Sequence, residues 1–205
     1  MAASLTSTDL TLGNTSGASI PGTPLAGQTV IYPKDDKLLY YKNDAGVERR
    51  VDADLGYMHV RDEKAVYTAG GASLSGVNTR VLNTVVTNTI VGASLATNKV
   101  TLPAGTYNLY GSAPNWKGNG HKAYIYNVTA AALSIYGTTS HSWETDNTQT
   151  SSVIHGRITI TVATEFELRH NIALARATDG LGFATNLTAS SGPEVYGELE
   201  ITKVA

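Results

Sequence analysis

Three segments of the sequence concentrate side chains that bind ligands, and their composition is typical of loops. They are residues 114–120, 137–149 and 175–191, each rich in Gly, Asn, Ser or Thr. A tryptophan face can stack on a sugar ring, while amide, imidazole and carboxylate groups satisfy the sugar hydroxyls. We therefore predict a ligand-binding surface, suited to a glycan, that contains Trp116, Lys117, Asn119, His141, Trp143, Glu144 and Asp146. In the alternative, the two tryptophans cap the fold or pack between protomers.

The histidines do not show the spacing of a metal site. No H-x-H or H-E-x-x-H pattern occurs, and the absence of cysteine removes thiolate ligands. His170 lies in phase with the apolar residues of its segment, which predicts either a core histidine or one at a three-fold interface. His155 lies in phase with polar residues. We expect no metal and no cofactor.

The acidic residues of the C-terminal part show no catalytic arrangement. A glycosidase needs two carboxylates placed across a sugar, whereas Glu165, Glu167, Glu198 and Glu200 occupy outward positions of amphipathic segments. Gly-x-Ser-x-Gly and Walker-type loops are absent. We therefore predict a protein that is not an enzyme, and a glycan depolymerase is kept as a less favoured alternative.

Composition excludes several partners. The chain has 205 residues, of which 41% are hydrophobic, so it can bury a core without disulfides. The formal net charge of −2 gives no attraction for nucleic acid or an anionic bilayer. No apolar run reaches the roughly 18 residues that a membrane helix needs, and the N-terminus lacks the features of a secretory signal. We expect no nucleic-acid binding, no membrane insertion and synthesis in a cytoplasm.

The elements that must position the loops are strands. Residues 79–205 contain short alternating runs separated by turn residues, which predicts an all-β sandwich. Residues 100–111 read as a strand, a turn at 103–105 and a second strand with Tyr107, Leu109 and Gly111 on one face. The last strand is predicted to lie centrally in its sheet. In the two clearest alternating segments, one set of residues is predicted to face the core. These residues are Ile154, Gly156, Ile158, Ile160 and Val162 in the first segment, and Val195, Gly197, Leu199 and Ile201 in the second.

The N-terminal part has a different character. Residues 1–28 are rich in Ser, Thr, Gly and Ala without a regular period, which predicts an extended arm or, alternatively, a disordered tail. Residues 29–67 are predicted to form a short β-stalk, and the Gly-rich residues 68–78 to link it to a head at 79–205. A short hairpin is marginal alone. We therefore expect three copies to bury four stalk residues between them: Val30, Tyr32, Leu39 and Tyr41.

The segment V-T-L-P-A-G-T-Y at residues 100–107 resembles a strand-turn-strand signature of C1q/TNF-like trimeric jelly-roll heads. Such heads include those at the ends of bacteriophage fibres and spikes. The motifs R-D-E-K, T-A-G-G and T-R-V-L-N-T, between residues 61 and 84, are similar to the lead-in of these phage heads. The resemblance implies a C-terminal jelly-roll β-sandwich, preceded by the arm and stalk, in an intertwined homotrimer.

The same resemblance implies a virion structural protein, a tail or head fibre or spike made in the host cytoplasm and exposed on the particle exterior. Residues 1–28 would attach it to other virion proteins. The distal head would bind a glycan or protein of the host surface, and three weak sites per trimer would act together. A capsid decoration or cement protein without receptor binding is an alternative. The lack of cysteine and of a signal peptide disfavours a secreted C1q-like ligand of a eukaryote.

Overall fold

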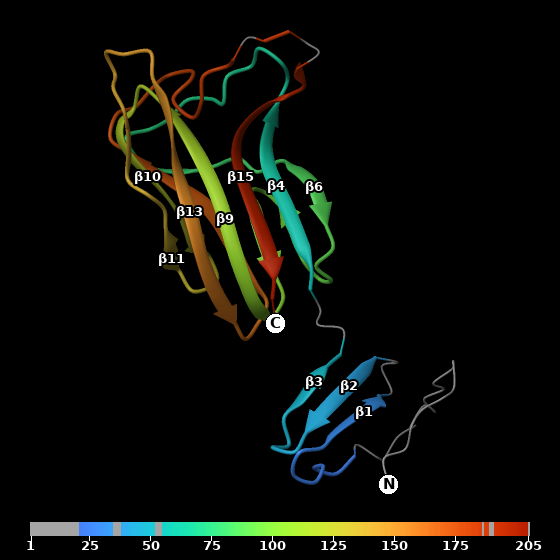
Figure 1. Cartoon of the computed structure of the whole chain (residues 1–205). Coiled ribbons are helices and arrows are strands. Elements are labelled where there is room, and N and C mark those ends of the chain that lie inside the picture. Colours follow the sequence, from blue (N-terminus) through green and yellow to red (C-terminus); the bar gives the residue numbers. More distant parts are fainter. Residues whose placement is uncertain (1–20, 35–37, 52–54, 186, 189–190, 205) are drawn as a thin grey trace. The chain divides into compact units, whose positions relative to one another are not determined.

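The chain divides into two compact units, Met1–Asp54 and Leu55–Ala205 (Figure 1). The computed structural model describes residues 21–34, 38–51, 55–185, 187–188 and 191–204. Residues 1–20 of the predicted arm therefore lie outside the described residues. The remainder of that segment contacts the first unit, because the Lys42 ammonium donates to the Pro21 carbonyl at 3.1 Å and the Gly27 amide donates to Asp44 Oδ2 at 2.7 Å.

The described strands of the first unit form one antiparallel sheet. They are β1 (Thr29–Pro33), β2 (Leu39–Asn43) and β3 (Glu48–Arg50), in the order β1-β2-β3. Tyr32 is buried and lies opposite Tyr40. Because side chains alternate between the two faces of a sheet, Val30 and Tyr32 lie on one face while Leu39 and Tyr41 lie on the other. The four residues do not form one cluster within a chain, and their contact between chains stays a prediction.

The second unit is a sandwich of two antiparallel sheets (Figure 1). Its strands are β4 (Tyr57–Lys64), β5 (Gly76–Thr79), β6 (Thr84–Asn88), β7 (Ser94–Ala96), β8 (Lys99–Leu102), β9 (Gly105–Trp116), β10 (Asn119–Asn127), β11 (Ala132–Tyr136), β12 (Ser140–Ser142), β13 (Gln149–Ile160), β14 (Thr164–Ile172) and β15 (Glu194–Lys203). The described residues contain no α-helix, and none of their elements is a helix able to cross a membrane. The all-β prediction is therefore confirmed.

The two sheets differ in the number and in the order of their strands. The five-stranded sheet has the order β13-β9-β15-β4-β6. The seven-stranded sheet has the order β11-β10-β14-β8-β7, with β12 also paired to β10 and β5 to β14. As predicted, the last strand β15 lies at the centre of its sheet. The turn at 103–105 carries the chain from β8 in one sheet to β9 in the other, so the predicted strand-turn-strand is present.

The boundary between stalk and head differs from the predicted one. Strand β4, which the sequence analysis placed in the stalk, pairs with β15 and β6 inside the second unit. The Gly-rich residues 68–78 also belong to this unit, because the Gly70 amide donates to the Gly182 carbonyl at 2.8 Å. The charged residues of β4 are the reason that the sequence analysis did not place this strand in the head. Met58, Val60 and Asp62 are all buried, and the Asp62 carboxylate forms an ion pair with Lys64 at 2.9 Å.

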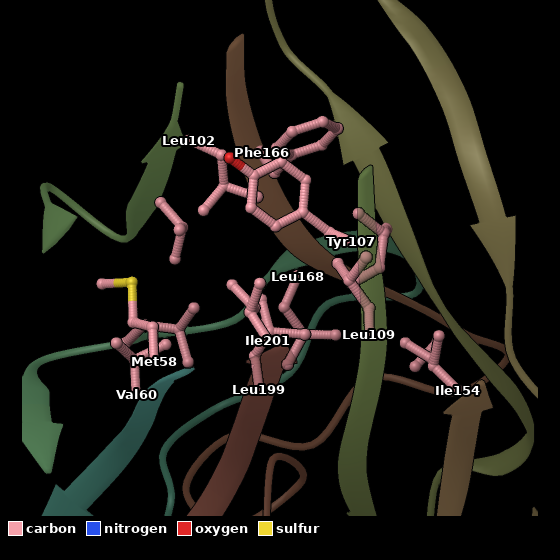
Figure 2. Packing of buried hydrophobic residues seen from close by; sticks show 14 of the residues in the cluster. Met58, Val60, Leu102, Tyr107, Leu109, Ile154, Phe166, Leu168, Leu199 and Ile201 are labelled. Atoms are coloured by element: carbon pink, nitrogen blue, oxygen red, sulfur yellow. The ribbon is translucent and has the colours of Figure 1, made fainter. Parts of the chain in front are cut away.

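The core lies between the sheets and draws on both (Figure 2). Phe166 and Leu168 from β14 meet Leu199 and Ile201 from β15, and all four are almost fully buried. Burial of each such side chain stabilises the fold by about 1.5–3 kcal/mol. Tyr107 is also fully buried, and its hydroxyl donates to the Pro103 carbonyl at 2.7 Å. The inward face predicted for β9 is therefore confirmed.

The predicted alternation holds along β13 but changes phase in β15. Ile154 is buried, as predicted, whereas Val162 lies beyond the end of β13 and is 63% exposed. In β15, the register shifts between Val195 and Glu198. This bulge turns Tyr196 into the core and leaves Val195 40% exposed, so the inward prediction for Val195 is wrong. A bulge adds one residue to a strand and so reverses the alternation.

Candidate functional site

The three predicted loops lie together at one end of the sandwich. The first connects β9 to β10, the second runs from β11 to β13 and contains the short strand β12, and the third connects β14 to β15. Figure 1 shows these connections at the end of the second unit that lies opposite the C-terminus. At the other end, where the C-terminus lies, the Lys203 amide donates to the Gly56 carbonyl at 2.8 Å. The chain thus enters and leaves the second unit at one end and presents the loops at the other.

A buried asparagine fixes the loops relative to one another. Asn115, near the end of β9, is fully buried. Its Nδ2 donates to the Gly180 carbonyl at 2.7 Å, and its Oδ1 accepts from the Gly118 amide at 2.9 Å and the Ser142 hydroxyl at 2.6 Å. Gly180 and Gly118 belong to the third and first loops, and Ser142 lies in the second. Because a buried polar group without partners is costly, Asn115 favours a single arrangement of the loops.

Arg80 supports the same end from inside the sandwich. It is fully buried, and its Nη1 and Nη2 donate to the carbonyls of Pro114 at 3.2 Å and Leu181 at 2.7 Å. Burial lowers the pKa of the guanidinium to about 10, and the charge of Asp62 acts in the opposite direction. Arg80 therefore remains charged at neutral pH and joins the end of β9 to the third loop.

Four of the predicted binding residues form one surface, here called the Trp143 surface: Asn119, His141, Trp143 and Glu144. Trp143 is 59% exposed, and its ring centroid lies 4.2 Å from that of His141. Asn119 Oδ1 accepts from the Glu144 backbone amide at 3.1 Å, which joins the second loop to the first. Asn119 itself has a φ of 59°, a left-handed conformation that asparagine tolerates well. The surface therefore combines an exposed aromatic face with polar groups on a fixed backbone.

The other three predicted residues have different positions. Trp116 is buried and stacks on Phe183 with ring centroids 4.5 Å apart, as in the alternative in which a tryptophan caps the fold. Lys117 Nζ lies 5.4 Å from the centroid of the Trp116 ring. Asp146 is exposed, and its amide donates to the Trp143 carbonyl at 3.3 Å within a turn. We leave Trp116 out of the binding surface.

An open hollow of about 310 Å³ adjoins the Trp143 surface. It is lined by Gly120, His121, Lys122, Thr139, Asn171 and Ala173. Gly120 lies opposite His141 in the pairing of β10 with β12, which makes the hollow continuous with the surface. On β10, the Lys122 ammonium lies 5.0 Å from the centroid of the exposed Tyr136 ring. The predicted loops included Gly120 and Thr139 but not Lys122 and Asn171, because outward side chains of two strands carry no motif.

Two buried histidines lie beneath this end. His121 Nδ1 is 2.9 Å from His170 Nε2, and His121 Nε2 is 2.9 Å from the Thr150 hydroxyl. Burial lowers the pKa of His121 to about 4 and that of His170 to about 2, and the charge of Arg80 acts in the same direction on both. Both rings are therefore neutral at pH 7. Of the two predicted positions for His170, the core position is confirmed.

The loop end offers binding groups rather than an assembled reaction centre. An exposed indole, an imidazole and a carboxylate lie beside an open hollow that is lined in part by an ammonium, which suits a ligand with a ring and several hydroxyls. Among the residues that the structure describes, one cluster of possible metal ligands occurs: His59, Glu198 and Glu200. It lies on β4 and β15 and outside the three loops.

Comparison with known proteins identifies the fold of the second unit. It identifies no family and no curated relative of the chain. No protein-family model matches the chain, and no curated protein matches it significantly. The TNF protein Eiger from S. frugiperda matches with a TM-score of 0.50 at 13% identity, over 73% of this chain and 92% of that one. Murine APRIL at pH 5.0 matches with a TM-score of 0.48 at 12% identity, over 73% of this chain and 99% of that one.

The second unit is therefore a TNF-like jelly roll. At an identity of 13% the likeness to Eiger shows the fold alone. The fold agrees with the predicted C1q/TNF-like head.

Proposed function

We propose that this chain is a structural protein of a bacteriophage virion, a fibre or spike whose head binds a host-surface receptor through the Trp143 surface. The observation that carries the proposal is the position of that surface: Trp143 is exposed and lies in the connection from β12 to β13, which is at the end of the head opposite the C-terminus. A receptor on a cell would meet this end first. The jelly-roll fold and the resemblance of residues 100–107 to phage heads support the assignment to a virion.

The chemistry of the surface favours a glycan as the receptor. The Trp143 ring offers an apolar face for stacking, and Glu144 supplies a carboxylate that accepts hydrogen bonds from hydroxyls. The adjoining hollow adds the ammonium of Lys122 and the amide of Asn171. Its volume falls within the range of ligand sites, about 300–1,000 Å³. An open site of this kind binds one sugar weakly.

A homotrimer would overcome that weakness. Three heads joined in one particle present three equal surfaces, and several trimers on a virion multiply them, so that avidity exceeds the affinity of a single site. The proposal therefore includes a trimer of this chain on the exterior of the virion, attached to other virion proteins through residues 1–28.

An adsorption competition assay tests the proposal. Purified full-length protein is added to host cells before virions that carry this chain, and we expect it to block adsorption. Trp143→Ala should weaken the block about tenfold or more, because truncation of a central aromatic residue commonly costs that much binding energy. Val162→Ala is the matched control, since Val162 is 63% exposed but lies beyond the far end of β13.

Each other outcome points to a different function. Protein that folds but does not compete for adsorption would exclude receptor binding and favour capsid decoration. Equal competition by the Trp143→Ala variant and the unmodified chain would move the binding site away from the Trp143 surface. Release of reducing ends from host glycan by the purified protein would instead favour a depolymerase.

A further inference from the structure

Three side chains that can ligate a metal converge on the outward face of the five-stranded sheet. His59 in β4 lies directly opposite Glu200 in β15, and Glu198 precedes Glu200 by two positions on the same face. One ligand atom from each of the three lies within 4.8 Å of those of the other two. The cluster joins the first strand of the second unit to its last strand.

The distances suit a small divalent cation. His59 Nε2 lies 3.4 Å from Glu198 Oε2. Ligand atoms of a tetrahedral zinc site lie about 3.3–3.6 Å apart, given bonds of about 2.0–2.2 Å. A carboxylate oxygen of Glu200 lies within 4.8 Å of both of the other ligand atoms. The three residues therefore supply one imidazole nitrogen and two carboxylate oxygens around a common point.

The state of the imidazole points to a missing partner. His59 Nε2 is shielded from solvent and has no well-oriented hydrogen-bond partner among the described residues, and Glu198 Oε2, 3.4 Å away, forms an ion pair with it only if the ring is protonated. Shielded nitrogen atoms in native proteins are nearly always paired. A cation at this point would satisfy the nitrogen, and its charge would offset the two carboxylates that face it.

The surrounding groups leave the carboxylates available and hold one of them in place. Arg61 lies opposite Glu198 in the register, yet its guanidinium donates to Glu63 instead. The Tyr57 hydroxyl donates to Glu200 Oε2 at 2.7 Å. Partners of this kind orient the ligands of metal sites.

We propose that His59, Glu198 and Glu200 bind a divalent first-row transition cation, for which Zn²⁺ is the probe. Imidazole and carboxylate together suit such cations better than Ca²⁺ or Mg²⁺, which prefer oxygen ligands alone. Three protein ligands leave a fourth position for water or for an acceptor from a bound partner. The inference is independent of the proposed function, because the cluster lies on the outward face of a sheet and outside the Trp143 surface.

Calorimetric titration of the full chain with Zn²⁺, after removal of metal with a chelator, tests the site. We expect saturable binding of one ion per chain and a higher melting temperature with Zn²⁺ present. His59→Gln should weaken binding more than about 100-fold, and Tyr57→Phe about tenfold, as for ligands and their orienting partners in known sites. His155→Gln is the matched control, because His155 lies exposed on the same face, in β13.

The ligand assignment has a second readout. Co²⁺ in place of Zn²⁺ should give visible absorption bands that disappear in Glu200→Gln, which tests the site even if His59→Gln fails to fold. Absence of saturable binding to the unmodified chain would overturn the proposal. Equal losses in His59→Gln and His155→Gln would overturn it too, as would one ion per three chains, because the ligands of a single chain would then not suffice.

Discussion

His121 and His170 occupy a place in the sandwich where a positive charge is costly, because burial and the charge of Arg80 both oppose it. Their pKa values in the folded state, about 4 and about 2, lie below the value of about 6.5 in an unfolded chain. The unfolded chain therefore binds more protons below pH 6.5. The free energy of unfolding should fall as pH drops from 6.5 toward 4, by up to about 1.4 kcal/mol per pH unit for each histidine.

Urea unfolding between pH 7 and pH 5 measures this slope while most carboxylates stay ionised. His121→Gln should reduce the slope, since glutamine keeps hydrogen-bonding groups but does not titrate. His155→Gln is the control for the substitution itself, because His155 is exposed and lies away from the two buried rings. A slope that is the same in His121→Gln as in the unmodified chain would contradict the link between these buried rings and acid stability.

Single residues also show how far the sequence alone can predict a site. The residue types of a binding surface were recognisable in the three loops, and Asn119, His141, Trp143 and Glu144 do lie together. The sequence could not separate exposed Trp143 from buried Trp116, because each lies in a polar segment with the composition of a loop. It also gave no sign of the cluster around His59, whose carboxylates are about 140 positions away along the chain and become neighbours only when β4 pairs with β15.

Strands were predictable where their pattern was regular. The alternation of β13 survives in the structure because the strand is paired along its whole length with β9. In β15 the bulge reverses the alternation near Val195, and no sequence signal marked it. Strand β4 was missed because a buried Asp62 interrupts its apolar positions and charged residues flank them. Periodicity thus identifies strands, but a bulge or a buried charge changes which face is apolar.

The packing of β11 against β13 depends on a glycine. A Cβ at Gly156 would lie 2.8 Å from Ile135 Cδ1 and Cγ2, so the Ile135 side chain would have to move. Overpacking of this kind costs about 1–3 kcal/mol. At Gly111, in the neighbouring strand, the nearest atoms would be 3.4 Å away, an ordinary contact. Gly156→Ala should therefore destabilise the fold by about 1–3 kcal/mol, and Gly111→Ala by less.

Urea unfolding of the two variants compares them directly, because both glycines lie in adjacent strands of one sheet. Equal stability of the Gly156→Ala variant and the unmodified chain would mean that Ile135 moves at no cost. The edge strand β11 would then not be packed firmly against β13.

At the scale of the whole molecule, the division of the chain decides which fragments can fold. The core cluster begins at Met58 and lies entirely within residues 55–205, which also supply both sheets of the sandwich. A fragment that begins at Thr68, the start of the predicted linker, would lack β4 and leave β15 without one neighbour. The fragment 55–205 keeps every strand of the sandwich and is the smallest that tests the head alone.

The fragment 55–205 is expected to form a trimer without the first unit. Its edge strand β6 carries two exposed valines, Val85 and Val86, which are 47% and 45% exposed. Apolar side chains on an open edge favour association with another chain. Light scattering should give three times the 21.6 kDa of one chain for the full-length protein, and a trimer also for the fragment.

A monomeric fragment with a trimeric full chain would assign trimerisation to the first unit, where Tyr32, Leu39 and Tyr41 become the residues to change. Monomers in both cases would remove the avidity on which weak glycan binding by a virion protein depends.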